Sequence, residues 1–138
     1  LRLKPRVKLS GSEEFKSGQN KDLMIRAIVE SQMLAIRLHS SWIGKNFKTI
    51  RITGGGSKNP GICQTAADIF GADVETIAIP DSAALGGAII AAVADGASDF
   101  YELSAKFAKP VRVIHPRMEY KNLYDEMLEK YKTFEEEK

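Results

Sequence analysis

Three consecutive glycines, Gly54, Gly55 and Gly56, stand where a β-branched stretch ends and a helical pattern begins. A strand that runs through such a turn into a helix presents several backbone N–H groups and the positive helix end to a ligand, an arrangement that suits phosphate. The absent side chains also let a flat ring such as adenosine lie against the backbone. Asn59, which precedes the helix, can either cap it or offer its amide to a purine edge.

The glycines alone leave a second interpretation equally open, because glycine clusters commonly form tight turns that bind nothing. The segment matches neither G-x-G-x-x-G nor G-x-x-x-x-G-K-[ST], so Rossmann and P-loop sites lose support. Lys58 stands where it can meet a phosphate, although a solvated side chain is the simpler expectation. Asp68 is either a structural partner across a cleft between domains or, more simply, a surface acid. Glu30 is either buried and hydrogen-bonded or exposed to solvent.

The spacing of apolar residues predicts the elements that position this turn. Expected helices cover residues 20–41, 60–70, 82–94, 99–107 and 119–134, and expected strands cover 49–53, 74–79 and 111–114. Asn20, Asn59 and Pro60 favour helix starts, and Gly71 and Gly96 favour helix ends. Strands that alternate with helices of this length are typical of a parallel sheet with right-handed crossovers, so we expect an α/β fold of parallel strands with flanking helices.

Two further segments carry structural signals. Residues 1–19 are expected to be a flexible lead-in, with a short edge strand from Arg6 to Leu9. The helix over 82–94 holds Gly86, Gly87 and several alanines, so a neighbouring backbone or a ligand can approach it closely. Each glycine inside a helix costs about 1 kcal/mol relative to alanine, and a close approach must offset that cost.

Length and composition exclude several kinds of protein. A chain of 138 residues fits one domain, and 43% hydrophobic with 28% charged residues is ordinary for a globular protein. The net charge of +2 is too small to predict nucleic acid or an anionic membrane as a partner. The single cysteine, Cys63, excludes an internal disulfide and fits a reducing cytoplasm, and two histidines argue against a metal site. No apolar run has the length of a membrane span, so we expect a soluble cytoplasmic protein.

Three motifs follow one another in this chain: RAIVESQMLAIR, IRITGGGSKNPGICQTAADIFGADV and DSAALGGAIIAAVADG. With this order and spacing, the stretch over about residues 22–97 resembles the C-terminal half of the FGGY family of carbohydrate kinases, most closely its xylulokinase branch. The later stretch YELSAKFAKPVRVIHPRMEYKNLYDEMLEKYK is similar to the usual end of such kinases.

The resemblance implies an actin-like, ribonuclease H-like fold, of which residues 1–138 form part of the C-terminal domain. It implies that Gly54, Gly55 and Gly56 line the pocket for the adenosine and α-phosphate of ATP, and that Asn59 faces the adenine. The implied reaction is in-line transfer of the γ-phosphoryl group of ATP to a sugar hydroxyl, with Mg²⁺ and an aspartate base.

The same resemblance places the catalytic residues outside this chain. The family's phosphate-binding Asp-x-Gly-Thr segment, its sugar-binding residues and its aspartate base all lie upstream of what corresponds to Leu1, as do the first strands of the domain. We therefore expect a fragment, without catalytic residues, of an ATP-dependent kinase for a ketopentose such as D-xylulose. Ribulose, rhamnulose, fuculose, gluconate and glycerol stay open as acceptors. The alternative is a non-catalytic nucleotide-binding or assembly module of actin-like fold, and an exposed sheet edge would favour a homo-oligomer.

Overall fold

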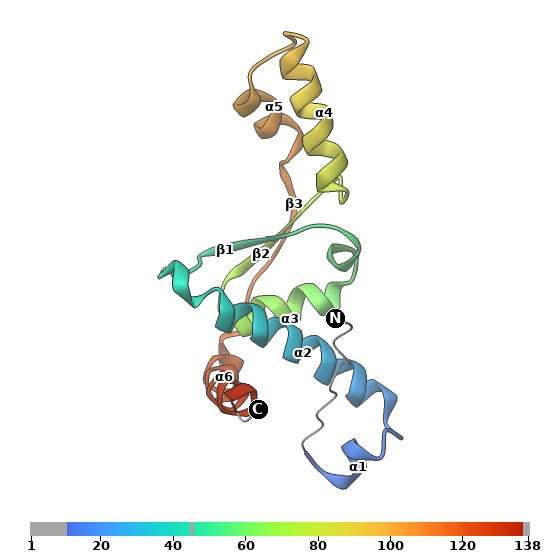
Figure 1. The fold of residues 1–138 in the computed structure, drawn as a ribbon, viewed down its shortest axis with the longest axis vertical. Helices are drawn as coiled ribbons and strands as arrows, with labels where there is room; N and C mark the ends of the chain where they lie inside the picture. Colours follow the sequence, from blue (N-terminus) through green and yellow to red (C-terminus); the bar gives the residue numbers. More distant parts are fainter. Residues whose placement is uncertain (1–10, 45, 137–138) are drawn as a thin grey trace, which may run out of the picture.

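The computed structural model describes residues 11–44 and 46–136, which form helices around a small sheet (Figure 1). The helices are α1 (Glu13–Lys16), α2 (Lys21–His39), α3 (Pro60–Phe70), α4 (Ser82–Ala94), α5 (Phe100–Phe107) and α6 (Lys121–Glu136). The strands are β1 (Thr49–Ile52), β2 (Asp73–Ile77) and β3 (Pro110–Ile114), and short 3-10 turns are η1 (Ser41–Ile43), η2 (Gly55–Lys58) and η3 (Met118–Tyr120).

The helices and strands predicted within the described residues are all present, and their ends differ from the predicted ones by no more than two residues. The short helix α1 was not predicted and lies in the stretch expected to be a flexible lead-in. It begins at Ser12, whose side chain accepts a hydrogen bond from the Phe15 N–H. The edge strand predicted from Arg6 to Leu9 lies outside the described residues.

Side-chain caps and one glycine fix the helix ends around the sheet. The Asn20 side chain accepts a hydrogen bond from the Leu23 N–H at 3.1 Å at the start of α2. The Asp81 side chain accepts one from the Ala84 N–H at 3.0 Å at the start of α4. Gly71 ends α3 with φ 60°, a left-handed conformation that favours glycine. Each polar cap contributes about 1 kcal/mol, so these local signals set where the elements begin.

The sheet has the order β1-β2-β3 and is mixed. β1 and β2 are parallel, with Thr49 opposite Asp73, and α3 is the crossover between them. β3 runs antiparallel to β2, with Val74 opposite Ile114. The expected parallel arrangement therefore holds for β1 and β2 and does not extend to β3. The path of the chain explains the difference, because α4 leads away from the end of β2, α5 packs against α4, and the chain re-enters the sheet at that same end (Figure 1).

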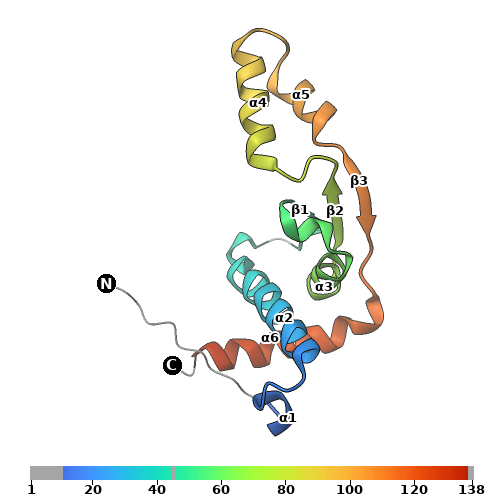
Figure 2. The same cartoon turned by 90° about the vertical axis from the view of Figure 1, so that its right-hand side faces the viewer.

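The helices α2 and α3 lie on one face of the sheet, and α6 crosses next to them (Figure 2). One buried cluster lies between α3 and the sheet and contains Cys63, Ala66, Ala67 and Val74. A second lies between the three helices and contains Leu34, Ile69 and Tyr124. Small side chains on α3 let the helix lie close to the sheet, so α3 is held firmly where the glycine turn enters it.

The helix α4 stands away from this core together with α5 (Figure 1). Its one buried residue is Ile89. A Cβ placed at Gly86 or Gly87 would meet no heavy atom within 4 Å, so the close approach expected at these glycines is not made by any described residue. Although α4 is apolar, no helix within residues 11–44 and 46–136 is long and apolar enough to cross a membrane.

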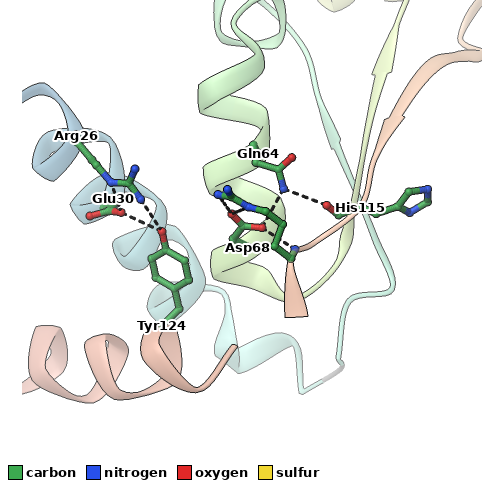
Figure 3. Close-up of polar contacts among 7 residues, drawn as sticks. Arg26, Glu30, Gln64, Asp68, His115 and Tyr124 are labelled. Carbon is green, nitrogen blue, oxygen red and sulfur yellow. Dashed lines mark hydrogen bonds and ion pairs between the residues drawn. The ribbon is translucent and has the colours of Figure 1, made fainter. Parts of the chain in front are cut away.

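Asp68 lies inside the protein, where it is 2% exposed. Its carboxylate accepts hydrogen bonds from Arg117 Nη2 at 2.6 Å, from the Arg117 backbone N–H at 2.8 Å and from Gln64 Nε2 at 2.9 Å (Figure 3). Gln64 also donates to the backbone carbonyl of His115 at 3.0 Å. The simpler expectation of a surface acid is therefore wrong, because Asp68 and Gln64 fasten the segment after β3 to α3. Burial alone would raise the pKa of Asp68, but the hydrogen bonds from Arg117 and Gln64 outweigh it and hold that pKa below its ordinary value.

A second polar cluster joins α2 to α6. The Tyr124 hydroxyl donates to the Glu30 carboxylate at 2.9 Å, and Arg26 donates to Glu30 at 3.0 Å and to the Tyr124 oxygen at 3.3 Å (Figure 3). Of the two alternatives for Glu30, the hydrogen-bonded and largely buried one is found, with 15% of its side chain exposed. Burial, and then the Glu30 carboxylate, raise the pKa of the Tyr124 hydroxyl.

We expect Asp68→Asn to lower the free energy of unfolding by about 2 kcal/mol at neutral pH, because it removes a buried carboxylate that accepts charge-assisted hydrogen bonds. The folded-state pKa of Asp68 is depressed, so its stabilising contribution is complete above the unfolded pKa of about 4 and is lost as the pH falls through the folded value. Urea unfolding at several pH values measures both effects. Asp95→Asn, which changes an exposed carboxylate, is the control. The account would be contradicted if the difference in the free energy of unfolding between Asp68→Asn and the wild type became larger as the pH falls.

We expect Tyr124→Phe to cost about 1 kcal/mol, because Glu30 loses one hydrogen bond but keeps its contact with Arg26. Thermal or urea unfolding measures the change. Tyr101→Phe removes the same hydroxyl from a side chain that is 83% exposed, and it should leave stability unchanged. The interpretation of Tyr124 as a clamp between α2 and α6 fails if the two variants are equally stable.

Candidate functional site

The glycine turn leads from the end of β1 into α3, and a hydrogen bond joins it to the segment that follows β2. Gly54 adopts φ 75° and ψ −163°, a combination that glycine alone reaches without strain. Its N–H donates to the carbonyl of Pro80, shortly after β2, at 2.7 Å. Because β1 and β2 are parallel, both strands end at the same edge of the sheet. Ligands of open α/β sheets bind at this kind of edge.

Buried groups hold the turn from beneath. Ser57 is 4% exposed, and its hydroxyl donates to the Gly54 carbonyl at 2.7 Å. The Ser57 carbonyl accepts a hydrogen bond from Arg112 Nη2 at 2.9 Å and lies 3.6 Å from the Sγ atom of Cys63. Burial raises the pKa of the Cys63 thiol, and the charge of Arg112 opposes part of that rise. The thiol therefore stays protonated at neutral pH and acts as a weak donor beneath the turn.

Asn59 caps α3. Its side-chain oxygen accepts hydrogen bonds from the N–H groups of Gly61 at 2.9 Å and Ile62 at 3.3 Å, and its backbone carbonyl accepts one from Cys63 at 3.2 Å. Capping, one of the two roles predicted for Asn59, is thus present. Its side-chain amide nitrogen forms no hydrogen bond with another described residue, and a contact from this group to adenine stays a prediction.

Gly55 and Gly56 differ from Gly54 because the backbone does not require glycine at either position. Neither has a positive φ. A Cβ at Gly55 would meet no heavy atom within 4 Å, and one at Gly56 would lie an ordinary 3.9 Å from Ile62 Cγ2. The turn itself therefore needs only Gly54, while the bare backbone at Gly55 leaves a surface that a ligand can approach. The space at Gly55 leaves room for the ligand-binding interpretation, which stays a prediction.

An open depression of about 330 Å³ lies beside the turn. Its lining consists of Gly54, Gly55, Lys58, Pro80, Asp81, Ser82 and Ala83. Of the predicted site residues, Gly54 and Gly55 line it, whereas Gly56 and Asn59 follow in the chain without lining it. Lys58 is exposed, as expected, and is one of the residues that line the depression.

The opposite wall of the depression comes from the start of α4. The sequence pattern assigns these residues only to a helix start, yet Ser82 Oγ lies 3.1 Å from Thr53 Oγ1, and the Ser82 N–H donates to the Pro80 carbonyl at 3.1 Å. Asp81 lies in the same wall. These residues could have been predicted from the strand order. Because neighbouring parallel strands end at the same edge of a sheet, the residues after β2 lie close to those after β1.

A larger groove of about 760 Å³ lies between α2, α3 and α6. Arg37 in its wall donates to Asp125 at 2.6 Å and to the Ile69 carbonyl at 2.7 Å, so its charge is already engaged. No predicted site residue lines this groove. We therefore locate the candidate site at the glycine turn, where bare backbone meets the edge of the parallel strands.

The depression offers binding groups rather than a catalytic pair. The turn backbone, the Lys58 ammonium and the Ser82 hydroxyl suit a polar, phosphate-bearing ligand. Asp81 is the acid in the lining, and its carboxylate caps α4. In the part of the chain that the structure describes, no group of three or more His, Cys, Asp or Glu side chains is placed to hold a metal ion.

Comparison with known proteins identifies relatives for most of the chain. Residues 7–94 match the model of the FGGY family of carbohydrate kinases, C-terminal domain. The chain is 36% identical over 121 residues to the xylulose kinase of Rattus norvegicus, which covers 83% of this chain and 23% of that protein. It is 44% identical over 70 residues to xylulose kinase 2 of Arabidopsis thaliana, which covers 49% of this chain and 12% of that protein.

A solved structure has a similar fold. The ligand-bound xylulose kinase from Lactobacillus acidophilus matches with a TM-score of 0.75 and 25% identity, over 90% of this chain and 25% of that chain. The chain thus spans about a quarter or less of the length of these relatives. The similarity confirms the expected α/β, actin-like fold. The chain belongs to the FGGY family of carbohydrate kinases, with residues 7–94 matching the C-terminal domain of that family.

Proposed function

We propose that this chain is the adenosine-binding part of an ATP-dependent kinase that phosphorylates a sugar hydroxyl, with a ketopentose such as D-xylulose as the acceptor. The observation that carries the proposal is the open backbone at Gly55, which lies at the shared edge of β1 and β2 in a chain of the FGGY family. The acceptor rests on the relatives, which are named xylulose kinases.

The part that this chain plays is binding and orientation. We assign Gly54, Gly55 and Gly56 to the adenosine and α-phosphate, with Gly54 and Gly55 presenting bare polar backbone to the depression, and the Asn59 amide nitrogen is the donor that we assign to the adenine edge. Lys58 adds a positive charge at the rim, where it can meet a phosphate. Holding ATP in one orientation lowers the entropic part of the barrier to in-line γ-phosphoryl transfer.

The remaining chemistry is assigned to other parts of the protein, since this chain spans about a quarter or less of its relatives. The aspartate base, the sugar-binding residues and the ligands of Mg²⁺ beyond the ATP phosphates belong there. Mg²⁺ neutralises developing charge on the phosphates in this class of reaction. The cytoplasmic location and the homo-oligomer stay predictions.

The direct test is a kinase assay on the full-length protein that contains this chain. We expect ADP release from MgATP that depends on D-xylulose and exceeds the sugar-free rate, because phosphoryl transfer needs the acceptor hydroxyl. Ribulose, gluconate and glycerol, each at the same concentration, measure acceptor preference. ATP binding without ADP release, with every acceptor tried, would support the non-catalytic module instead.

We expect Gly55→Val to weaken ATP binding by at least about tenfold while the fold is kept, because the new side chain projects into the space proposed for the nucleotide. Isothermal titration with a non-hydrolysable ATP analogue measures the affinity, and the melting temperature checks the fold. Ala105→Val adds a branched side chain at an exposed site on α5 and serves as the control. Unchanged ATP affinity in a folded Gly55→Val protein removes the assignment of the site.

A further inference from the structure

Arg112 reaches the glycine turn from a distant part of the chain. It lies on β3, opposite Thr76 of β2, and its Nη2 atom donates to the carbonyl of Ser57 at 2.9 Å. The sheet order places β2 between β1 and β3. The Arg112 side chain therefore spans β2 to reach the turn that follows β1, and this one contact joins residues 55 positions apart in the sequence.

The peptide group between Ser57 and Lys58 is what this contact orients. A peptide group is planar and trans, so its carbonyl and its N–H point in opposite directions. Holding the Ser57 carbonyl toward Arg112 consequently adds to the restraint that the 3-10 turn η2 places on the direction of the Lys58 N–H. Lys58 lines the depression beside the turn, whereas Ser57 is buried beneath it. The contact is thus made on the buried side of the turn, and it acts on the residue that lines the depression proposed for the nucleotide.

The charge of Arg112 has no carboxylate partner in the described part of the chain, since its one polar contact there is the Ser57 carbonyl. Another arginine of the sheet, Arg51 on β1, is paired with Glu75 at 2.7 Å. The charge of Arg112 is felt at the base of the turn, where it opposes the rise in the pKa of Cys63. Arg112 is exposed, so solvent screens part of its charge, and the unpaired guanidinium adds a modest positive potential that favours an anionic ligand.

We propose that Arg112 is a positioning residue of the nucleotide site, which orients the Ser57–Lys58 peptide and adds positive charge beside the glycine turn. This inference rests on the proposed ATP site. Arg112 does not line the depression, so it acts on ATP through the turn and through its field rather than by direct contact. A carbonyl is a better partner than a carboxylate for this role, because it leaves the positive charge uncompensated.

Steady-state kinetics of the full-length kinase test this role with two variants. Arg112→Met keeps an unbranched apolar stem but loses the guanidinium, with its donors and its charge, and we expect the KM for ATP to rise about tenfold, the factor that corresponds to one charge-assisted hydrogen bond. The KM for the sugar and the melting temperature should stay near the wild-type values. Arg112→Lys keeps the charge and a donor without the planar fork, and we expect a rise of about threefold.

The matched control is Arg51→Met, which removes an arginine of the same sheet that does not contact the turn and should leave the KM for ATP unchanged. An unchanged KM for ATP in Arg112→Met overturns the inference, as does a rise in both KM values together with a loss of thermal stability. If Arg112→Met does not fold, the Lys variant decides alone, and a wild-type KM for ATP in that variant overturns the inference. Gly55→Val separates the two proposals. If this variant loses ATP binding while Arg112→Met keeps a wild-type KM for ATP, the assignment of the ATP site stands and only the role of Arg112 is overturned.

Discussion

The parallel pairing of β1 with β2 is the constraint on which the candidate site depends. It forces α3 to cross over one face of the sheet, and the small side chains of Cys63, Ala66 and Ala67 let that helix lie close to the strands. The crossover in turn requires a sharp exit from β1, which Gly54 provides through its positive φ. The same pairing brings Pro80 within hydrogen-bond distance of Gly54, so the turn and the start of α4 become two walls of one depression.

Features that depend on near neighbours in sequence could be predicted from the residues. Helix starts at Asn20 and Asn59 follow from side chains that bond N–H groups two or three positions away. The end of α3 at Gly71 follows from one backbone conformation. The glycine turn could also be predicted, because it too depends on residues that are adjacent in sequence. The structure adds the difference between Gly54, whose positive φ requires glycine, and Gly55, beside which the space is open.

Contacts between distant residues carry no periodic signal, and those are the features that the sequence did not indicate. Asp68 looked like a surface acid because its partner, Arg117, is 49 positions away. The direction of β3 depends on α4 and α5 leading the chain back to the end of β2, which strand propensity alone does not encode. The contact between Arg112 and Ser57 likewise exists only after three strands are placed side by side.

The two walls of the depression are held by contacts of different strength. The glycine wall rests on buried groups, since Ser57 is bonded to both Gly54 and Arg112 and lies against the fully buried Cys63. The α4 wall is joined to it by the backbone hydrogen bond from Gly54 to Pro80 and by an exposed contact between the hydroxyls of Thr53 and Ser82, and α4 itself stands away from the core (Figure 1). Buried hydrogen bonds are costly to break, while exposed ones exchange with water. The glycine wall is therefore the preorganised half of the site, and a ligand that binds there does not have to order the turn first.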